Sequence, residues 1–213
     1  VEISRSVFKV TTITEAQAEI EMVGVQRPFT SIPIPGKIAY LTAGNAWVMN
    51  AATGDRQPVV TTADLDGRIF SLSPDGEWLL FTRKPQPEQT DILNSLWVVE
   101  VNGDADNQPI DLKTYNIIHF ADWIPGVNQT IYYSTVEPRS APPGWQANND
   151  LYRLRFSTSG ATAETTILES SIGGIYGWWG TSYAISPNGF RLAYARPDSI
   201  GLVDTEEKTV TPL

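Results

Sequence analysis

Residues 73–83 read Ser-Pro-Asp-Gly-Glu-Trp-Leu-Leu-Phe-Thr-Arg, and residues 186–196 read Ser-Pro-Asn-Gly-Phe-Arg-Leu-Ala-Tyr-Ala-Arg. Each stretch is a Pro/Gly turn followed by branched and aromatic residues, which predicts a tight turn leading into a short β-strand. Residues 35–42 and 125–134 follow the same plan more loosely. The sequence therefore contains an internal repeat of four units, and the content of one unit predicts the fold.

The rest of each unit is also repeated. A second strand-like segment begins near residues 45, 95, 150 and 199, and a polar turn and a last short strand follow it. The turn prolines Pro35, Pro74, Pro125 and Pro187 are 39, 51 and 62 residues apart. A base period near 40 residues with four short strands is typical of a β-propeller blade, and the longer intervals predict loop insertions.

We therefore predict an all-β chain with four propeller blades, at about residues 28–66, 67–115, 116–171 and 172–213. Residues 1–27 lie outside the repeat and are expected to form an extension, an extra hairpin or part of a blade. Propellers close with about four to eight blades. We expect these blades to belong to a ring of six or more, as a fragment of a longer polypeptide or beside another chain. A closed ring of four or five blades that uses residues 1–27 is the alternative.

The repeat resembles a known family. The pattern Ser-Pro-Asp-Gly-x-x-Leu-Leu-Phe-Thr-Arg, followed by Leu-Trp-Val-Val at residues 96–99, resembles the TolB-type (WD40-like) propeller repeat. The resemblance covers most of residues 35–213 and is closest in the second and fourth units. It implies inner strands at residues 69–72, 117–121 and 182–185. It also implies a periplasmic, extracellular or cell-surface scaffold.

Composition argues against most catalytic and cofactor chemistry. The 213 residues include no cysteine and one histidine, His119, which excludes thiol catalysis, disulfides and multi-histidine metal sites. No Gly-x-Ser-x-Gly elbow of a serine hydrolase is present. The net charge of −9 argues against nucleic acid, and no apolar run is long enough for a membrane span. We therefore predict that the chain is not an enzyme and uses no cofactor or metal, and that His119 is structural or lines the channel.

The alternating direction of the strands within a blade predicts a partner-binding face. Because strands of a blade alternate in direction, the insertions at residues 84–94, 136–149 and 169–180 should all lie on one face. Long loops on rigid scaffolds often carry function, and Trp, Tyr and Arg are enriched at binding hot spots. The candidate partner-binding residues are Arg139, Trp145, Tyr176 and Trp178.

Two functions remain open at this point. The first is a non-catalytic scaffold that binds a protein or peptide partner, or another chain that completes the propeller. The alternative is an accessory propeller of a peptidase or of a glycan-active hydrolase, because related propellers precede the catalytic domain of prolyl-oligopeptidase-type enzymes.

Overall fold

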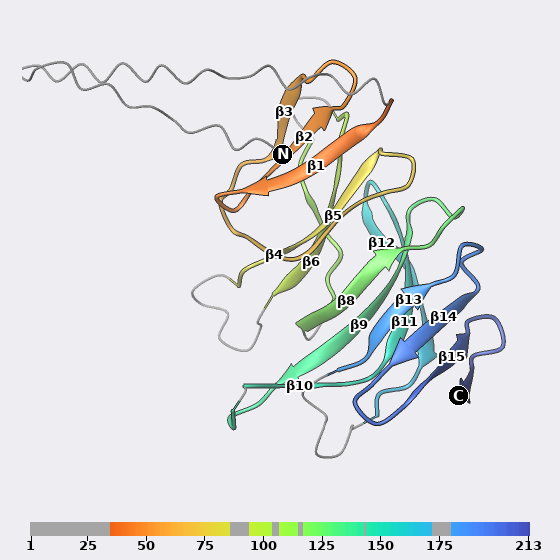
Figure 1. Cartoon of the computed structure of the whole chain (residues 1–213). Helices are drawn as coiled ribbons and strands as arrows, with labels where there is room; N and C mark the ends of the chain where they lie inside the picture. The colour runs from red at the N-terminus through yellow and green to blue at the C-terminus, as the bar shows by residue number, and fades with distance from the viewer. Residues whose placement is uncertain (1–34, 86–93, 104–106, 115–116, 143, 172–179) are drawn as a thin grey trace, which may run out of the picture.

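The computed structural model describes residues 35–85, 94–103, 107–114, 117–142, 144–171 and 180–213. These residues form antiparallel β-sheets and turns, with no helix, and so none that is long and apolar enough to cross a membrane. The sheets follow one another along the chain in an arc (Figure 1), and we call them blades 1 to 4. The prediction of an all-β chain of propeller blades is confirmed. The expected extension at residues 1–27 lies outside the described residues.

Each blade is built from consecutive strands in chain order. Blade 1 contains Lys37–Thr42 (β1), Asn45–Asn50 (β2) and Arg56–Val60 (β3), and blade 2 contains Leu65–Leu72 (β4), Trp78–Arg83 (β5), Ser95–Glu100 (β6) and Ile110–Asp111 (β7). Blade 3 contains Ile117–Trp123 (β8), Thr130–Pro138 (β9), Trp145–Ala147 (β10), Leu151–Ser157 (β11) and Gly160–Leu168 (β12). Blade 4 contains Ser182–Ile185 (β13), Arg191–Ala195 (β14), Ile200–Asp204 (β15) and Thr209–Pro212 (β16). The strands β4, β8 and β13 contain the expected inner strands.

The Ser-Pro-Asp-Gly turn between β4 and β5 is stabilised by its own side chains. The Trp78 N–H donates to the Ser73 hydroxyl oxygen at 2.9 Å, and the Gly76 N–H donates to the Ser73 carbonyl at 2.8 Å. Gly76 has a φ of 71°, a conformation that glycine adopts without strain. The hydrogen bond between Asp75 and the Ser73 hydroxyl is the main cause that lowers the pKa of Asp75. Blade 4 repeats the turn, with Ser186 and Gly189 in the places of Ser73 and Gly76.

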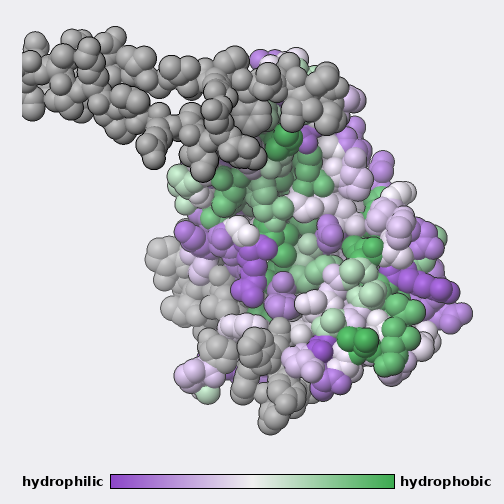
Figure 2. Space-filling view, viewed as in Figure 1, coloured by the Kyte–Doolittle hydropathy of each residue, from purple (hydrophilic) through white to green (hydrophobic). Residues whose placement is uncertain are grey.

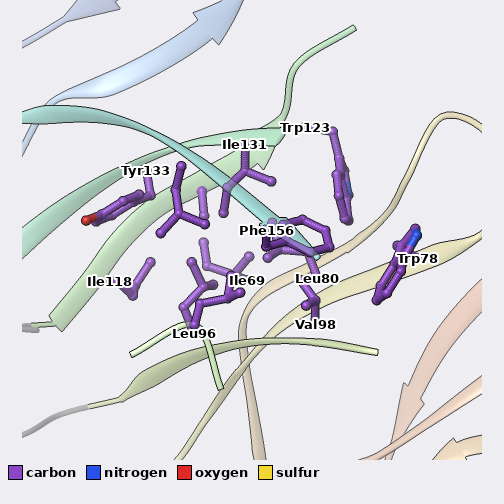
Figure 3. Packing of buried hydrophobic residues seen from close by; sticks show 13 residues of the cluster. Ile69, Trp78, Leu80, Leu96, Val98, Ile118, Trp123, Ile131, Tyr133 and Phe156 are labelled. Atoms are coloured by element: carbon purple, nitrogen blue, oxygen red, sulfur yellow. The ribbon is translucent and has the colours of Figure 1, made fainter. Parts of the chain in front are cut away.

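Three apolar clusters lie between neighbouring blades, and each contains residues from two successive blades. The middle cluster joins blades 2 and 3 (Figure 3). In it, Phe156 lies between two tryptophans, with its ring centroid 5.2 Å from that of Trp78 and 6.0 Å from that of Trp123. Because each sheet is apolar on both faces, a blade is stabilised mainly by the blades on either side of it.

Asparagine side chains also link each blade to the next one. In blades 1 to 3 an asparagine at or just before the start of β2, β6 or β11 accepts a hydrogen bond from the chain that enters the following blade. The pairs are Asn45 with the Ala63 N–H (2.8 Å), Asn94 with the Ile118 N–H (2.9 Å) and Asn149 with the Thr181 hydroxyl (2.8 Å). Asn94 and Asn149 are buried, and a buried polar group is costly unless it is paired, so their bonds help to fix how blades 2, 3 and 4 sit.

Candidate functional site

One end of the blades carries the turns that we expected to hold the insertions. The Lys84 N–H donates to the Asp64 carbonyl at 2.8 Å, so the end of β5 lies beside the start of β4. In blade 4 the Arg196 Nε donates to the Thr181 hydroxyl at 2.9 Å, which joins the end of β14 to the start of β13 in the same way. We call this end of the blades the second-turn face.

The segment at residues 136–149 is a hairpin on this face rather than the simple loop that the sequence suggested. β9 continues to Pro138, and β10 returns beside it with Trp145 opposite Pro138 and Ala147 opposite Val136. The side chains of Val136 and Ala147 are buried, and Trp145 packs against them. β-branched residues at 135 and 136 favour a strand, which is the signal that could have predicted this extension.

Three side chains from three different strands meet beside this hairpin, and we call them the Trp145 cluster: Arg68 of β4, His119 of β8 and Trp145 of β10. The His119 and Trp145 rings have centroids 5.8 Å apart and are tilted by 32°. The Arg68 guanidinium carbon lies 5.7 Å from the Trp145 ring centroid, within the range of a cation–π contact. The cluster therefore combines a cation, an aromatic surface and an imidazole.

His119 is held in its neutral form. Burial lowers its pKa to about 4, and the positive charge of Arg68 adds to this effect. Its Nδ1 is buried and has no hydrogen-bond partner among the described residues. Gly180 approaches the ring so closely that a Cβ at this position would overlap it. The imidazole is thus uncharged at pH 7, and no carboxylate among the described residues orients its Nδ1, as one orients the histidine of a catalytic triad.

A buried polar network holds the base of the hairpin. Asp150 accepts hydrogen bonds from the Ser134 hydroxyl at 2.8 Å and from the Thr135 N–H at 2.7 Å. Desolvation raises the pKa of Asp150, and the bonds from Thr135 and Ser134 oppose that rise. Asn148 donates to the Thr135 hydroxyl oxygen at 2.9 Å. Because these groups satisfy one another, the network fixes the hairpin relative to β11.

The four predicted partner-binding residues differ in what the structure says of them. Trp145 is half-buried and lies in the Trp145 cluster beside Arg68 and His119. Arg139 lies at the turn of the hairpin, where its N–H donates to the Gly144 carbonyl at 2.9 Å and its guanidinium lies 3.0 Å from the Glu137 carboxylate. Tyr176 and Trp178 lie outside the described residues. Sequence reasoning missed Arg68, which lies one residue before the predicted inner strand at residues 69–72 and belongs to β4 in the structure.

The described residues offer little for metal binding. They contain no group of three or more His, Asp or Glu side chains placed to hold a metal ion. The best-defined arrangement is therefore the Trp145 cluster, whose aromatic and cationic groups are suited to binding.

Comparison with known proteins identifies the fold. No protein-family model matches the sequence, and no curated protein matches it by sequence. Among solved structures, an oligogalacturonate lyase in complex with manganese matches with a TM-score of 0.53 at 14% identity. The match covers 83% of this chain and 50% of the lyase chain. The β-propeller domain of the Trilobed protease from Pyrococcus furiosus matches with a TM-score of 0.51 at 13% identity, over 83% of this chain and 52% of that chain.

The acylaminoacyl peptidase of Pyrococcus horikoshii matches with a TM-score of 0.52 at 16% identity, over 83% of this chain and 30% of that chain. The chain thus spans about half, or less, of the length of these three structures. At such low identity the likeness shows the fold alone, which is that of a β-propeller.

Proposed function

We propose that this chain is a non-catalytic interaction scaffold, built on TolB-like propeller repeats, that binds a protein or peptide partner on the second-turn face. The observation that carries the proposal is the Trp145 cluster, where Arg68 and Trp145 lie together on rigid strands. Tryptophan and arginine are the residue types most enriched at binding hot spots. The TolB resemblance of the repeat supports a periplasmic, extracellular or cell-surface location.

The chemistry of the cluster predicts the kind of segment that binds. An apolar or aromatic side chain of the partner packs on the Trp145 ring, and a carboxylate pairs with Arg68. Arg139, at the turn of the same hairpin, pairs with Glu137, so Arg68 is the cation on which the proposal rests. The neutral imidazole of His119 supports the Trp145 ring from behind and adds no charge. The partner segment is therefore acidic and contains an aromatic or large aliphatic residue.

Peptides selected from a displayed random library against the immobilised chain test this site. We expect Trp145→Ala to lower the affinity of the chain for the selected peptides by at least about 30-fold, as for a hot-spot anchor. Arg68→Ala should lower the affinity for acidic peptides more than the affinity for neutral ones. Phe190→Ala is the matched control, because Phe190 is an exposed aromatic at the opposite end of blade 4. Equal affinity for the Trp145→Ala variant and the parent chain, with folding intact, would refute the proposed site.

The second candidate function is an accessory propeller of a peptidase or glycan-active hydrolase. The likeness to the propeller of the Trilobed protease and to an acylaminoacyl peptidase favours it, but at the level of the fold only. The coding sequence on either side of residues 1 and 213 separates the two candidates. A catalytic domain there supports the accessory role, and further blades or an anchor support the scaffold.

We also propose that this chain performs no hydrolysis by itself. The chain's one histidine is His119, whose Nδ1 has no described hydrogen-bond partner, and the sequence has no cysteine. Assays with peptide anilides and p-nitrophenyl esters should therefore give background rates. Turnover that is lost in His119→Gln, in a variant that still folds, would contradict this expectation.

A further inference from the structure

The inner strands of blades 2 and 3 both carry a β-bulge near their second-turn ends. In blade 2, the register places residues 66–69 of β4 opposite the single β5 residue Thr82. In blade 3, His119 is an extra residue between two paired positions of β8. Bulges re-aim side chains and are over-represented beside functional sites. These two bulges carry two of the three members of the Trp145 cluster, Arg68 and His119.

The bulge in β4 changes the direction in which Arg68 points. Ile69 packs in the cluster between blades 2 and 3, and Phe70 packs in the cluster between blades 1 and 2. Because side chains alternate along a regular strand, Arg68 would lie on the same side as Phe70, toward blade 1. Its guanidinium carbon instead lies 5.7 Å from the ring centroid of Trp145, which belongs to blade 3. The bulge therefore brings the cation of the Trp145 cluster to its place.

A buried hydroxyl and a carboxylate fix this bulge. The Thr82 hydroxyl oxygen accepts a hydrogen bond from the Ile69 N–H at 3.0 Å, and the hydroxyl donates to the Asp66 carboxylate. The same Asp66 oxygen accepts the Arg68 N–H at 2.9 Å. Gly67, between them, has a φ of 74°, which suits a bulge. Because Thr82 is buried, removal of its hydroxyl would leave the Ile69 N–H without that partner.

The same hydrogen bonds keep the Arg68 guanidinium available to a carboxylate from outside. Asp66 is two residues from Arg68, but its carboxylate binds Thr82 and the backbone. Within the described part of the chain, Arg68 forms no ion pair, whereas other arginines pair with Asp or Glu. Arg68 is exposed, and Figure 2 shows hydrophilic surface at this end of blade 2, beside the strands labelled β4 and β5 in Figure 1. An arginine fork in this state is suited to a carboxylate.

We propose that Thr82 and Asp66 are positioning residues, which hold Arg68 beside Trp145 and so make the site select a carboxylate next to an apolar side chain. Neither residue needs to touch the partner, because both act through the backbone of the bulge, from which the Arg68 side chain extends. The selectivity rests on the proposed binding function of the Trp145 cluster. The placement of Arg68 does not, and it can be tested in the chain without any partner.

The pH titration of His119 by NMR tests the placement of Arg68, because the chain has one histidine and the charge of Arg68 lowers its pKa. Thr82→Val removes the hydroxyl and keeps the branched shape, whereas Thr82→Ser keeps the hydroxyl. Thr82→Val should raise the pKa of His119 most of the way to its value in Arg68→Ala, and Thr82→Ser should leave it near that of the parent chain. An unchanged pKa in Thr82→Val overturns the proposal, and so does an unchanged pKa in Arg68→Ala.

Acidic and neutral peptides selected on the parent chain test the consequence for binding. Thr82→Val should reduce the preference for acidic over neutral peptides several-fold, and Thr82→Ser should retain it. In a chain that already carries Arg68→Ala, Thr82→Val should not change the preference further, because both substitutions act on the same contact. Thr162→Val is the matched control, since the Thr162 hydroxyl donates to the Arg155 carbonyl at 3.1 Å on the outer strand β12 of blade 3.

Asp66→Ala is the second variant, and it decides the question if circular dichroism shows that Thr82→Val does not fold. Asp66 is half-buried, so its truncation disturbs the core less than a change at Thr82. Loss of a nearby negative charge alone would lower the pKa of His119, so a rise in Asp66→Ala can come only from displacement of Arg68. A pKa that does not rise in this variant overturns the proposal.

The positioning role and the binding function fail in different ways. If Arg68→Ala reduces binding but Thr82→Val changes neither the pKa of His119 nor the peptide preference, the positioning role is wrong and the binding site stands. If Thr82→Val raises the pKa of His119 but no selected peptide depends on Trp145 or Arg68, the binding function is wrong, whereas the role of Thr82 in holding Arg68 is supported.

Discussion

Replacing Phe156 with alanine is expected to cost about 3–5 kcal/mol of unfolding free energy, the range for a fully buried phenylalanine. Phe156 is 2% exposed and lies between Trp78 of blade 2 and Trp123 of blade 3 (Figure 3). Its removal leaves a cavity between two blades that contact each other mainly through this cluster. Denaturant unfolding followed by tryptophan fluorescence measures the loss.

Such a loss is a large part of a total stability of about 5–15 kcal/mol. Phe190→Ala is the matched control, because Phe190 is 51% exposed and its truncation should change stability by no more than about 0.5 kcal/mol. If the two variants lost the same stability, blades 2 and 3 would not pack as described here.

The stability of the protein should fall as the pH drops from about 6.5 to about 4, and His119 should cause a large share of that fall. The pKa of His119 is lowered from 6.5 to about 4 in the folded state, because burial and Arg68 disfavour the imidazolium. The unfolded chain therefore binds this proton at a higher pH than the folded chain does. The stability that neutral His119 contributes is fully present above pH 6.5 and is lost as the pH falls toward the folded pKa.

Because the pKa of His119 falls from 6.5 to about 4 on folding, this loss is on the order of 3 kcal/mol. His119→Gln provides the comparison, since glutamine does not titrate and retains a polar side chain. Unfolding free energies of both proteins at pH 7.5, 5.5 and 4.5 should diverge in favour of the variant as the pH falls. Carboxylates such as Asp75 titrate in both proteins, so they cancel in the difference. Parallel curves would mean that His119 is not held neutral by its surroundings.

The repeat could be found in the sequence because its turn is a local structure. The Ser73 hydroxyl and carbonyl accept hydrogen bonds from backbone N–H groups of the turn, and Gly76 supplies a positive φ. The same few residue types therefore produce the same turn in blade 4. Branched and aromatic residues after each turn predicted the strands. The predicted inner strands at residues 117–121 and 182–185 lie within β8 and β13 for the same reason.

The candidate site could be predicted only in part. Strand parity placed Trp145 on the second-turn face, because alternation of direction within a blade is a property of connectivity. The contacts of Trp145 could not be predicted, since Arg68 and His119 are 77 and 26 residues away from it in the sequence. A contact between residues so far apart depends on how successive blades are placed, and no local pattern encodes that placement.

The sequence alone therefore determined the architecture: repeated turns, antiparallel strands and blades in chain order, all of which depend on interactions within about 40 residues. The tertiary structure alone decided which faces of the blades are covered. Ile200 and Leu96 occupy equivalent positions in the repeat and both favour burial, yet one is 55% exposed and the other is fully buried. The physical reason is that burial of a sheet face requires a neighbouring sheet, and in the described chain Leu96 has blade 3 beside it whereas Ile200 lies on the last blade.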